Sequence, residues 1–365
     1  MALATELYVA AAQLKGRMPP GLARELASVV RSTNCYYSNL IEGHNTHPWD
    51  IERALRGDYD ALPAQRNLQL EALAHIEVQK LIDEGAAPSP VVSEEFICWL
   101  HREFCKRLPA GLLTVDGGVA VTPGAYRTQH VSVGRHVAPA PNQIPSLLSH
   151  FVSAYGGSRE ASPWLLVEIA SAHHRLLWIH PFLDGNGRVA RLFSHAMLRE
   201  YAIGTDLWSI SRGLARHAIK YKQELASADE ARQGDLDGRG NLSERALTEF
   251  CEFFLKTCLD QVSFMGKMLD PSEILGRVTA WSNEEVAANR LPRGSTQLLR
   301  QALLEGEIAR GAVAEITGYR ERQGRTVLAA LLQRGVLKSD SPKGAVRLAF
   351  PSWVLERWLP ALYPN

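Results

Sequence analysis

The amino-acid sequence predicts a mainly α-helical protein with a short β-hairpin and a small separate domain at its C-terminal end. The 365 residues are enough for two or three domains. Apolar residues recur at helical spacing in several long segments, whereas strand-like alternation is scarce. The predicted helices cover residues 22–40, 68–82, 94–108, 163–179, 188–201 and 242–265.

The composition is that of an ordinary globular protein, with 46% hydrophobic and 22% charged residues. The formal net charge of +1 gives no general support for a polyanionic partner. The start of the chain lacks a basic segment followed by an apolar run, and no stretch reaches the length of a membrane helix. We therefore expect no signal peptide, no membrane contact and a cytoplasmic location.

The five cysteines predict a reduced protein rather than a disulfide framework. They contain no Cys-x-x-Cys pair, and Cys98–Cys105 and Cys251–Cys258 are each seven residues apart. That spacing places each pair on one helix face two turns apart, which is too far for a disulfide. We expect these thiols to be buried core residues.

Glycines, prolines and one stretch of alternating apolar and polar residues locate the remaining elements. Valines alternate with polar residues in 130–137 around a glycine, which predicts a short hairpin. Residues 234–240 are polar and glycine-rich, which predicts a loop before another helix. The helical pattern pauses at Asp270-Pro271 and at Pro292-Arg293-Gly294, where we expect the boundary of the C-terminal domain.

The most informative segment is His180-Pro181-Phe182-Leu183-Asp184-Gly185-Asn186-Gly187-Arg188-Val189-Ala190-Arg191. An apolar helix ends at His180 because Pro181 cannot continue it, and another begins near Arg188. Gly185-Asn186-Gly187 between them allows positive φ and close backbone approach. Unpaired amides and the positive end of a helix dipole make such a turn an anion site.

Neighbouring side chains extend this anion site. Arg188 and Arg191 are three apart and share one helix face, and two guanidinium groups suit a polyphosphate. Asp184 would repel phosphates unless Mg²⁺ lay between them, and Mg²⁺ is commonly held by one carboxylate plus phosphate oxygens. His180 alone in this segment has a side chain that titrates near neutral pH, as a general base needs.

Less specific interpretations apply to each feature alone. His180 can be a capping histidine, and the arginines a solvated helix face. Gly185-Asn186-Gly187-Arg188-Val189-Ala190 also fits the dinucleotide pattern Gly-x-Gly-x-x-Ala, but that pattern requires a preceding strand, and here a helix precedes it. The concentration of all these features within twelve residues favours a functional site.

The run His-Pro-Phe-Leu-Asp-Gly-Asn-Gly-Arg-x-x-Arg resembles the signature of the Fic (filamentation induced by cAMP) family without departure. The resemblance extends from about Ser32 to about Met265. It implies a Fic-type helical bundle with a β-hairpin flap, and transfer of AMP from ATP, with Mg²⁺, to a Tyr, Ser or Thr hydroxyl of a target protein or of the chain itself.

The resemblance also assigns roles to residues. His180 would be the general base, Phe182 would pack beneath the loop, and Asp184 would hold Mg²⁺. Gly185, Asn186, Gly187, Arg188 and Arg191 would bind the phosphates. The flap residues Val133, Gly134, Arg135 and His136 would cover the nucleotide and pair with an extended target segment. The adenine of the nucleotide would lie near Tyr221, Lys222 and Asp229. In many relatives a second Tyr stands where this chain has Lys222, and an Asn stands where it has Asp229.

Ser38-Asn39-Leu40-Ile41-Glu42-Gly43 ends the first long helix, with Gly43 suited to a C-terminal cap. Glu42 can be a solvated carboxylate, although a negative charge at a helix C-terminus opposes the dipole. The segment resembles the inhibitory motif Ser/Thr-x-x-x-Glu-Gly/Asn of Fic proteins. This implies that Glu42 pairs with Arg191, aided by Ser38, and keeps the γ-phosphate from its site.

The C-terminal pattern predicts a winged helix-turn-helix: a short helix 311–317, a turn, a helix 321–333 and a hairpin around 341–344. Residues 310–347 carry eight basic and three acidic side chains, a local net charge of +5. Arg322 and Arg325 could meet DNA. Protein contact or dimerisation is an equally good interpretation, and a homodimer is left open.

We expect four parts: an N-terminal helical region at 1–110, the Fic core at 111–268, a linker helix at 269–291 and the winged helix at 292–365. The main hypothesis is an autoinhibited AMP transferase. Two alternatives are an enzyme that removes AMP, with Glu42 orienting a water, and a DNA-binding regulator that uses the Fic domain as a nucleotide sensor.

Overall fold

The computed structural model describes residues 2–115, 118–157, 162–203 and 206–363. The chain is mainly helical and carries three two-stranded antiparallel sheets in this part. The mainly α fold class is therefore confirmed. Among the described helices, none is both long and apolar enough to cross a bilayer.

The first part of the chain contains α1 (Ala2–Gly16), α2 (Pro20–Ile41), α3 (Pro48–Leu55), α4 (Pro63–Asp83), α5 (Glu94–Cys105), η1 (Ala110–Leu112), β1 (Thr114–Val115), β2 (Val119–Ala120), β3 (Ser132–Val133), β4 (His136–Val137), η2 (Pro141–Gln143), α6 (Ile144–Tyr155), α7 (Pro163–Ile179), α8 (Asn186–Glu200), α9 (Ile210–Arg216), α10 (Ala218–Ala228) and α11 (Glu244–Met268).

The remainder contains α12 (Pro271–Ala287), α13 (Ser295–Glu305), η3 (Arg310–Ala312), α14 (Val313–Thr317), α15 (Glu321–Gln333), β5 (Leu337–Lys338), β6 (Arg347–Leu348) and α16 (Ser352–Trp358). The chain forms two compact units: residues 1–12 with 34–262, and residues 13–33 with 263–365. The predicted limits of the four parts stay a prediction.

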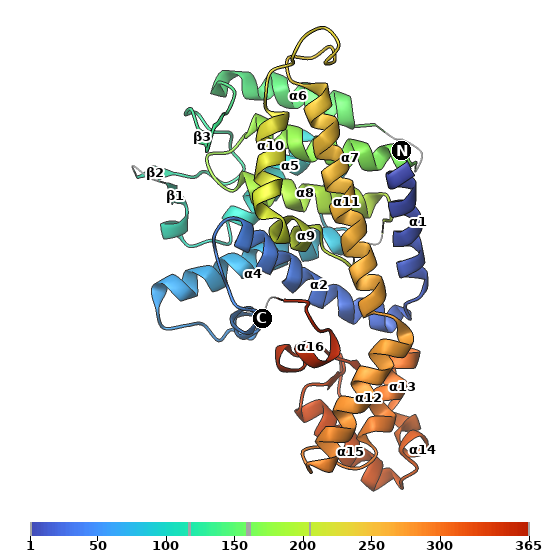
Figure 1. Cartoon of the computed structure of the whole chain (residues 1–365). Coiled ribbons are helices and arrows are strands. Elements are labelled where there is room, and N and C mark those ends of the chain that lie inside the picture. The colour runs from blue at the N-terminus through green and yellow to red at the C-terminus, as the bar shows by residue number, and fades with distance from the viewer. Residues whose placement is uncertain (1, 116–117, 158–161, 204–205, 364–365) are drawn as a thin grey trace. The chain divides into compact units, whose positions relative to one another are not determined.

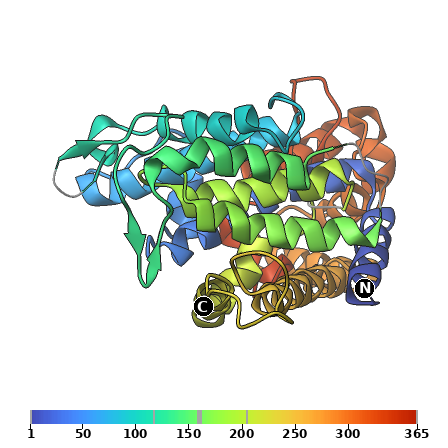
Figure 2. The same ribbon diagram turned by 90° about the horizontal axis from the view of Figure 1, so that it is seen from above.

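The larger unit is a bundle centred on α7 and α8 (Figure 1). Seen from above, the green helices α6, α7 and α8 lie side by side (Figure 2). The core is apolar and aromatic: Phe193 lies between Phe96 and Phe151, with ring centroids 6.4 and 5.7 Å away. Burying these rings stabilises the bundle by roughly 2–3 kcal/mol for each side chain.

Local sequence sets the helix ends of this bundle. Ser93 accepts a hydrogen bond from the amide of Phe96 and caps α5, whose first turn carries Glu94 and Glu95. The prediction that this helix extends to residue 108 was wrong, because α5 ends at Cys105. Pro109 disfavours the helical conformation of the residue before it, which is consistent with the earlier end.

The smaller unit packs around tryptophans. The rings of Trp281 and Trp358 meet edge to face at 5.2 Å, and both are buried. Glu25 of α2, itself buried, binds Lys338 of β5 and, at 2.9 Å, Arg347 of β6. A buried carboxylate thus holds the C-terminal hairpin within this unit.

Candidate active site

The segment between α7 and α8 is a tight turn. α7 ends at Ile179, and His180 follows in the left-handed conformation with φ 51° and ψ 59°. A left-handed conformation is unfavourable for a residue with a side chain, by roughly 1–2 kcal/mol. Gly185, with φ 79°, reverses the chain again immediately before α8. The turn thus places His180 beside the N-terminus of α8.

The side chain of Asn186 shapes this turn. Its Oδ1 accepts from the amide of Phe182 at 3.0 Å, and its Nδ2 donates to the carbonyl of Phe182 at 2.8 Å. Both ends of the amide are therefore engaged, and what Asn186 would offer a phosphate is its backbone N–H. The amides of residues 186–188 lie in the first turn of α8 and have no acceptor within the helix.

Phe182 forms the floor of the turn. Its ring is fully buried and stacks on the imidazole of His101, with ring centroids 4.0 Å apart and planes 5° from parallel. His101 in turn accepts a hydrogen bond from the amide of Gly124 at 2.8 Å. The floor is thus fixed from both sides by α5 and the segment that leads to the flap.

His180 is suited to accept a proton. Its Nδ1 lies 3.2 Å from the carbonyl of Leu177, which can only accept, so Nδ1 carries the hydrogen and Nε2 has the free lone pair. Burial lowers the pKa of His180 to about 4. The imidazole is therefore neutral at physiological pH.

Arg191 lies inside the bundle and is bound by the end of α2. Its Nε donates to the hydroxyl of Ser38 at 2.8 Å, and its Nη2 donates to the carbonyl of Ser38 at 3.1 Å and to Oε1 of Glu42 at 2.5 Å. The Arg191 side chain is only 2% exposed. Burial raises the pKa of Glu42, but Arg191 outweighs this effect and holds it below its usual range.

Gly187 allows this contact. A methyl group at this position would collide with Oε1 of Glu42 and would lie 3.1 Å from Nη1 of Arg191. The carboxylate therefore occupies the space directly beside the backbone of the glycine turn. The structure brings Ser38, Glu42 and the turn together.

Arg188 meets a carboxylate that the sequence analysis missed. Its Nη1 pairs with Oε1 of Glu71 in α4, and its guanidinium lies 4.9 Å from the ring centre of Phe104. The other oxygen of Glu71 lies 2.7 Å from Nδ1 of His44. Glu71 is an acidic residue on the buried face of α4 beside Ala72, and that pattern was the available signal.

Asp184 is the candidate metal ligand. Its side chain is 52% exposed and lies 3.6 Å from Nη2 of Arg188, while Oδ1 accepts from the amide of Gly185 at 2.6 Å. The described residues contain no group of three or more His, Cys, Asp or Glu arranged to hold a metal. One exposed carboxylate fits Mg²⁺, which takes its other ligands from phosphates and water.

The flap is β3 and β4, with Val133 opposite His136 and Gly134 at φ 60° in the turn. Val133, Gly134 and Arg135 are exposed, whereas the ring of His136 lies 6.4 Å from that of His180. The buried Arg127 fixes the base of the flap by donating to Gln129 at 2.9 Å and Pro139 at 2.6 Å. Sequence reasoning missed Arg127.

The three residues predicted to lie near the adenine are on α10 or directly after it, but their surroundings differ. Tyr221 is buried, and its hydroxyl lies 2.7 Å from Nε2 of His173. Lys222 is exposed. Asp229 lies between two imidazoles, 3.1 Å from His136 and 3.1 Å from His174. The hydroxyl of Tyr221 and both oxygens of Asp229 are thus engaged within the protein.

These features define a class: a helical bundle in which a His-containing glycine turn at a helix N-terminus is flanked by a β-hairpin. Residues 91–198 match the model of the Fic/DOC family. This segment is therefore a Fic/DOC domain, and the predicted resemblance to that family is confirmed for it.

Similar proteins and structures agree with this assignment. The chain is 30% identical over 175 residues to "Protein adenylyltransferase Fic" of Nematostella vectensis, covering 45% of this chain and 36% of that protein. It is 42% identical over 76 residues to the protein of that name from Aedes aegypti, covering 20% of this chain and 15% of the relative. The matches thus span about a third or less of these relatives.

A solved structure shows the same fold over most of the chain. The crystal structure of a Fic family protein from Desulfovibrio desulfuricans aligns with a TM-score of 0.55 and 19% identity, covering 96% of this chain and 97% of that one. A Fic domain-containing signalling protein from Bacteroides thetaiotaomicron aligns with a TM-score of 0.56 and 21% identity, covering 73% and 96%.

Proposed function

We propose that this chain is an autoinhibited protein adenylyltransferase, which transfers AMP from ATP to a hydroxyl of a target protein or of itself. The observation that carries the proposal is the position of His180, whose Nδ1 faces the carbonyl of Leu177 and leaves Nε2 to accept a proton, beside a glycine turn whose second arginine is bound by Glu42. The Nematostella and Aedes relatives carry the name of this activity.

The proposed reaction uses the chain's own groups as follows. The target hydroxyl lies against Nε2 of His180, which takes its proton as the oxygen attacks the α-phosphorus in line. The bond between the α- and β-phosphates breaks, and pyrophosphate leaves. General-base assistance of this kind contributes typically ~10²- to 10⁴-fold.

The turn and its arginines would hold the triphosphate while this happens. The amides of residues 186–188 and the dipole of α8 attract phosphate oxygens. Arg188, which is paired with Glu71 in the free chain, would turn its other guanidinium nitrogens to the phosphates. Asp184 would hold Mg²⁺, which supplies charge neutralisation of the phosphates when bound. The exposed edge of the flap, with Val133 and Val137, offers main-chain groups to an extended target segment.

Glu42 would act as the brake. With Arg191 bound to Glu42 and Ser38, its guanidinium is unavailable to a γ-phosphate, and the carboxylate beside Gly187 repels phosphate. A nucleotide would therefore bind without its α-phosphate aligned for attack. Removing the carboxylate would free Arg191 and restore alignment.

The test is the gain in mass of the full chain incubated with ATP and Mg²⁺. We expect Glu42→Gly to gain one AMP unit far faster than the wild type, and Glu42→Gly with His180→Ala to gain none. Glu84→Gly is a matched control, because α4 is also followed by a Glu-Gly turn in which the two amides after the glutamate make the same hydrogen bonds, but Glu84 is exposed. Equal labelling of wild type and Glu42→Gly would refute the brake.

The same preparations separate the alternatives. An enzyme that removes AMP would release it from an AMP-modified protein in the wild type and not in Glu42→Gly. A nucleotide sensor would bind ATP without releasing pyrophosphate in either form.

For the smaller unit we propose a winged-helix arrangement. α13 is followed by Ile308, which pairs with Val346, then by α14 and α15, and last by the hairpin β5–β6. This order of helix, strand segment, two helices and hairpin is that of a winged helix. Several basic side chains of 310–347 are bound by acidic groups, including Arg325 by Glu321.

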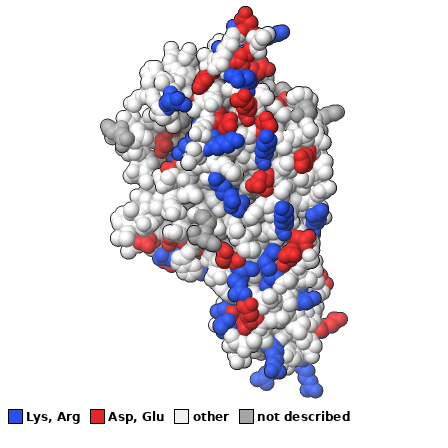
Figure 3. Space-filling model, viewed as in Figure 1, with Lys and Arg blue, Asp and Glu red and all other residues white. Residues whose placement is uncertain are grey.

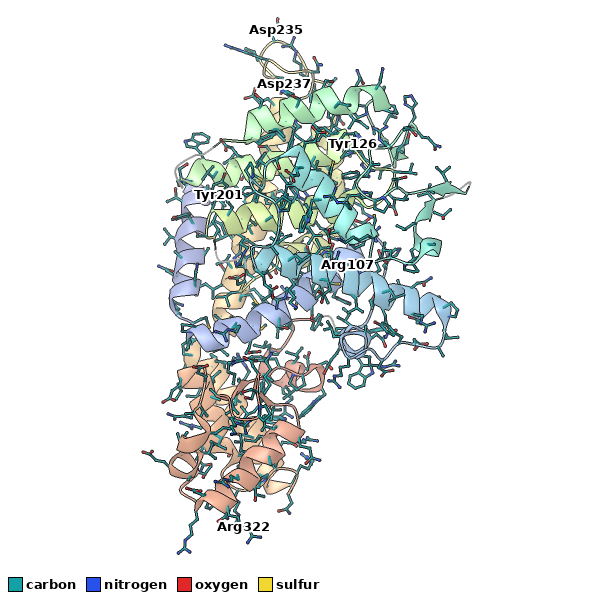
Figure 4. All side chains as sticks on the ribbon, turned by 180° about the vertical axis from the view of Figure 1, so that it is seen from behind. Arg107, Tyr126, Tyr201, Asp235, Asp237 and Arg322 are labelled. Atoms are coloured by element: carbon teal, nitrogen blue, oxygen red, sulfur yellow. The ribbon has the colours of Figure 1, made fainter. Side chains whose placement is uncertain are left out.

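DNA binding by this unit would use the exposed residues Arg322 and Lys343. Figure 3 shows basic side chains protruding at the lower end of the view, and Figure 4 labels Arg322 there. Salt-dependent binding of duplex DNA that Arg322→Glu weakens would support this use; its absence would favour a protein partner.

A further inference from the structure

Three side chains from three elements converge beside the flap. Nδ1 of His136 in β4 lies 3.1 Å from Oδ2 of Asp229, the residue that follows α10, and Nε2 of His174 in α7 lies 3.1 Å from Oδ1. The side chains of His136, Asp229 and His174 are 12%, 20% and 1% exposed. This cluster is not needed for phosphate binding or proton transfer as proposed above.

The partners of each atom define the protonation of the cluster. Nη1 of Arg175 donates to Nδ1 of His174 at 3.2 Å, so the hydrogen of His174 is on Nε2, which faces both Oδ1 of Asp229 at 3.1 Å and the carbonyl of Leu225 at 3.2 Å. His136 differs, because Nε2 lies 3.0 Å from the carbonyl of Trp178 and Nδ1 faces Asp229. Both of its nitrogens face acceptors, which only the doubly protonated imidazolium satisfies.

Charge agrees with this assignment. Burial lowers the pKa of His136, but the hydrogen bond and charge of Asp229 outweigh it, so the net shift is upward. Burial raises the pKa of Asp229, but the two histidines bring it down to about 2. The cluster is an ion pair between His136 of the flap and Asp229 at the end of α10. His174 contacts the second oxygen of the same carboxylate.

We propose that Asp229 is a positioning residue, a clasp that holds the flap beside His180 through its ion pair with His136. The catalytic meaning of the clasp rests on the proposed function, whereas the clasp itself belongs to the free chain. This assignment replaces direct contact between Asp229 and the nucleotide base, because both carboxylate oxygens are already engaged.

The flap needs such a contact. It consists of two residue pairs, and an isolated two-stranded hairpin is at best marginally stable in water. Val133 and Val137 are 52% and 72% exposed, so burial of the hairpin itself contributes little. Arg127 fixes its base, and His136 is the flap residue bound to the bundle beyond that base.

The clasp is pH-dependent. Four groups face His136: Asp229 after α10, His180 and the Trp178 carbonyl at the end of α7, and Arg127 from the segment before the flap. Asp229 also faces His174, which in turn accepts a hydrogen bond from Arg175. Asp229 and the arginines stay charged near neutral pH, and His180 stays neutral. Loss of the His136 proton at rising pH therefore weakens the ion pair.

Hydrogen–deuterium exchange of the free full-length chain tests the clasp without ATP or catalysis. Asp229→Asn keeps the size of the side chain and removes its charge, and His136→Ala removes the partner. We expect either change to accelerate exchange of the amides of 132–137 by about tenfold, the effect of ~1.4 kcal/mol. The double variant should exchange no faster than the faster single variant.

Asp235→Asn is the matched control. Asp235 lies in the exposed loop labelled in Figure 4, so the same change of charge should leave flap exchange as in the wild type. In the wild type the protection of the flap should decrease as the pH rises above the ordinary pKa of histidine, because the pKa of His136 is raised, and in Asp229→Asn this dependence should be lost.

Unchanged flap exchange in Asp229→Asn, additive effects in the double variant, or pH-independent protection in the wild type would each overturn the clasp. Protected amides in α8 report whether each variant is folded. If Asp229→Asn does not fold, the comparison of His136→Ala with the wild type across pH decides the question. Absence of AMP transfer by Glu42→Gly would refute the proposed function and leave this result unaffected.

Discussion

The Nε of Arg127 donates a 2.7 Å hydrogen bond to the backbone carbonyl of His180, 53 positions further along the chain. The same guanidinium donates to carbonyls at both ends of the flap, and the amide of Arg127 donates to Pro181 at 2.9 Å. One buried side chain therefore supports the left-handed conformation of His180 and fixes the base of the flap.

We expect Arg127→Lys to destabilise the protein by about 3 kcal/mol, because one ammonium cannot replace the planar fork and leaves buried carbonyls unpaired. Urea unfolding measures this difference. Arg56→Lys, in an exposed pair with Glu52, is the control and should change stability by less than about 0.5 kcal/mol. Equal unfolding midpoints for Arg127→Lys and the wild type would contradict this role.

Gly187 and Glu42 should be energetically coupled. Gly187→Ala places a methyl group against Oε1 of Glu42, so we expect a cost of about 1–2 kcal/mol in the wild type. In the Glu42→Gly background the carboxylate is absent, so Gly187→Ala should no longer destabilise the protein. Alanine in a helix is favoured over glycine by up to ~1 kcal/mol. A double-mutant cycle by denaturant unfolding measures the coupling, and additive effects would show that the carboxylate does not occupy this position.

Acid should destabilise the protein through buried neutral histidines. Burial lowers the pKa of His75 and His173 to about 3 and of His101 and His180 to about 4. The unfolded chain binds these protons from about pH 6.5 downward and the folded chain does not, so stability is lost as the pH falls through this window. Each such group contributes about 1.4 kcal/mol per pH unit between its two pKa values.

His136 acts in the opposite direction, since its pKa is raised, but it is outnumbered, because burial also lowers the pKa of His44 and His174. Urea unfolding at pH 7, 6 and 5 checks the sum. Glu42 and Asp229 have lowered pKa values and lose their contribution only at lower pH, so they do not obscure this range. A free energy of unfolding that stays constant from pH 7 to 5 would contradict the burial of neutral histidines.

Native-state thiol labelling should modify one cysteine. All five cysteines are free, and Cys98 is the one that is not buried. Burial raises the pKa of Cys105 and Cys251 to about 12, which further suppresses their reaction. Mass spectrometry after treatment with iodoacetamide should show at most one label in the native chain and five after denaturation, with none in native Cys98→Ser.

The sequence by itself determined the local structure of the site. Pro181 ends α7, Gly185 permits φ 79°, and the following residues begin α8, because these effects depend on the sterics of a few adjacent residues. Helical periodicity likewise predicted α7 and α15 with their observed limits. The resemblance of two motifs, rather than their spacing, predicted that Glu42 pairs with Arg191.

Only the tertiary structure decided which distant groups meet. Arg127 with His180, Glu71 with Arg188, and Asp229 with His136 join residues from separate elements, and nothing in the flanking residues specifies these pairs. The prediction that Asp229 contacts the nucleotide rested on its place in a motif. Packing of the flap against α7 and α10 brings an imidazole to each of its oxygens, and such contacts arise from the whole fold.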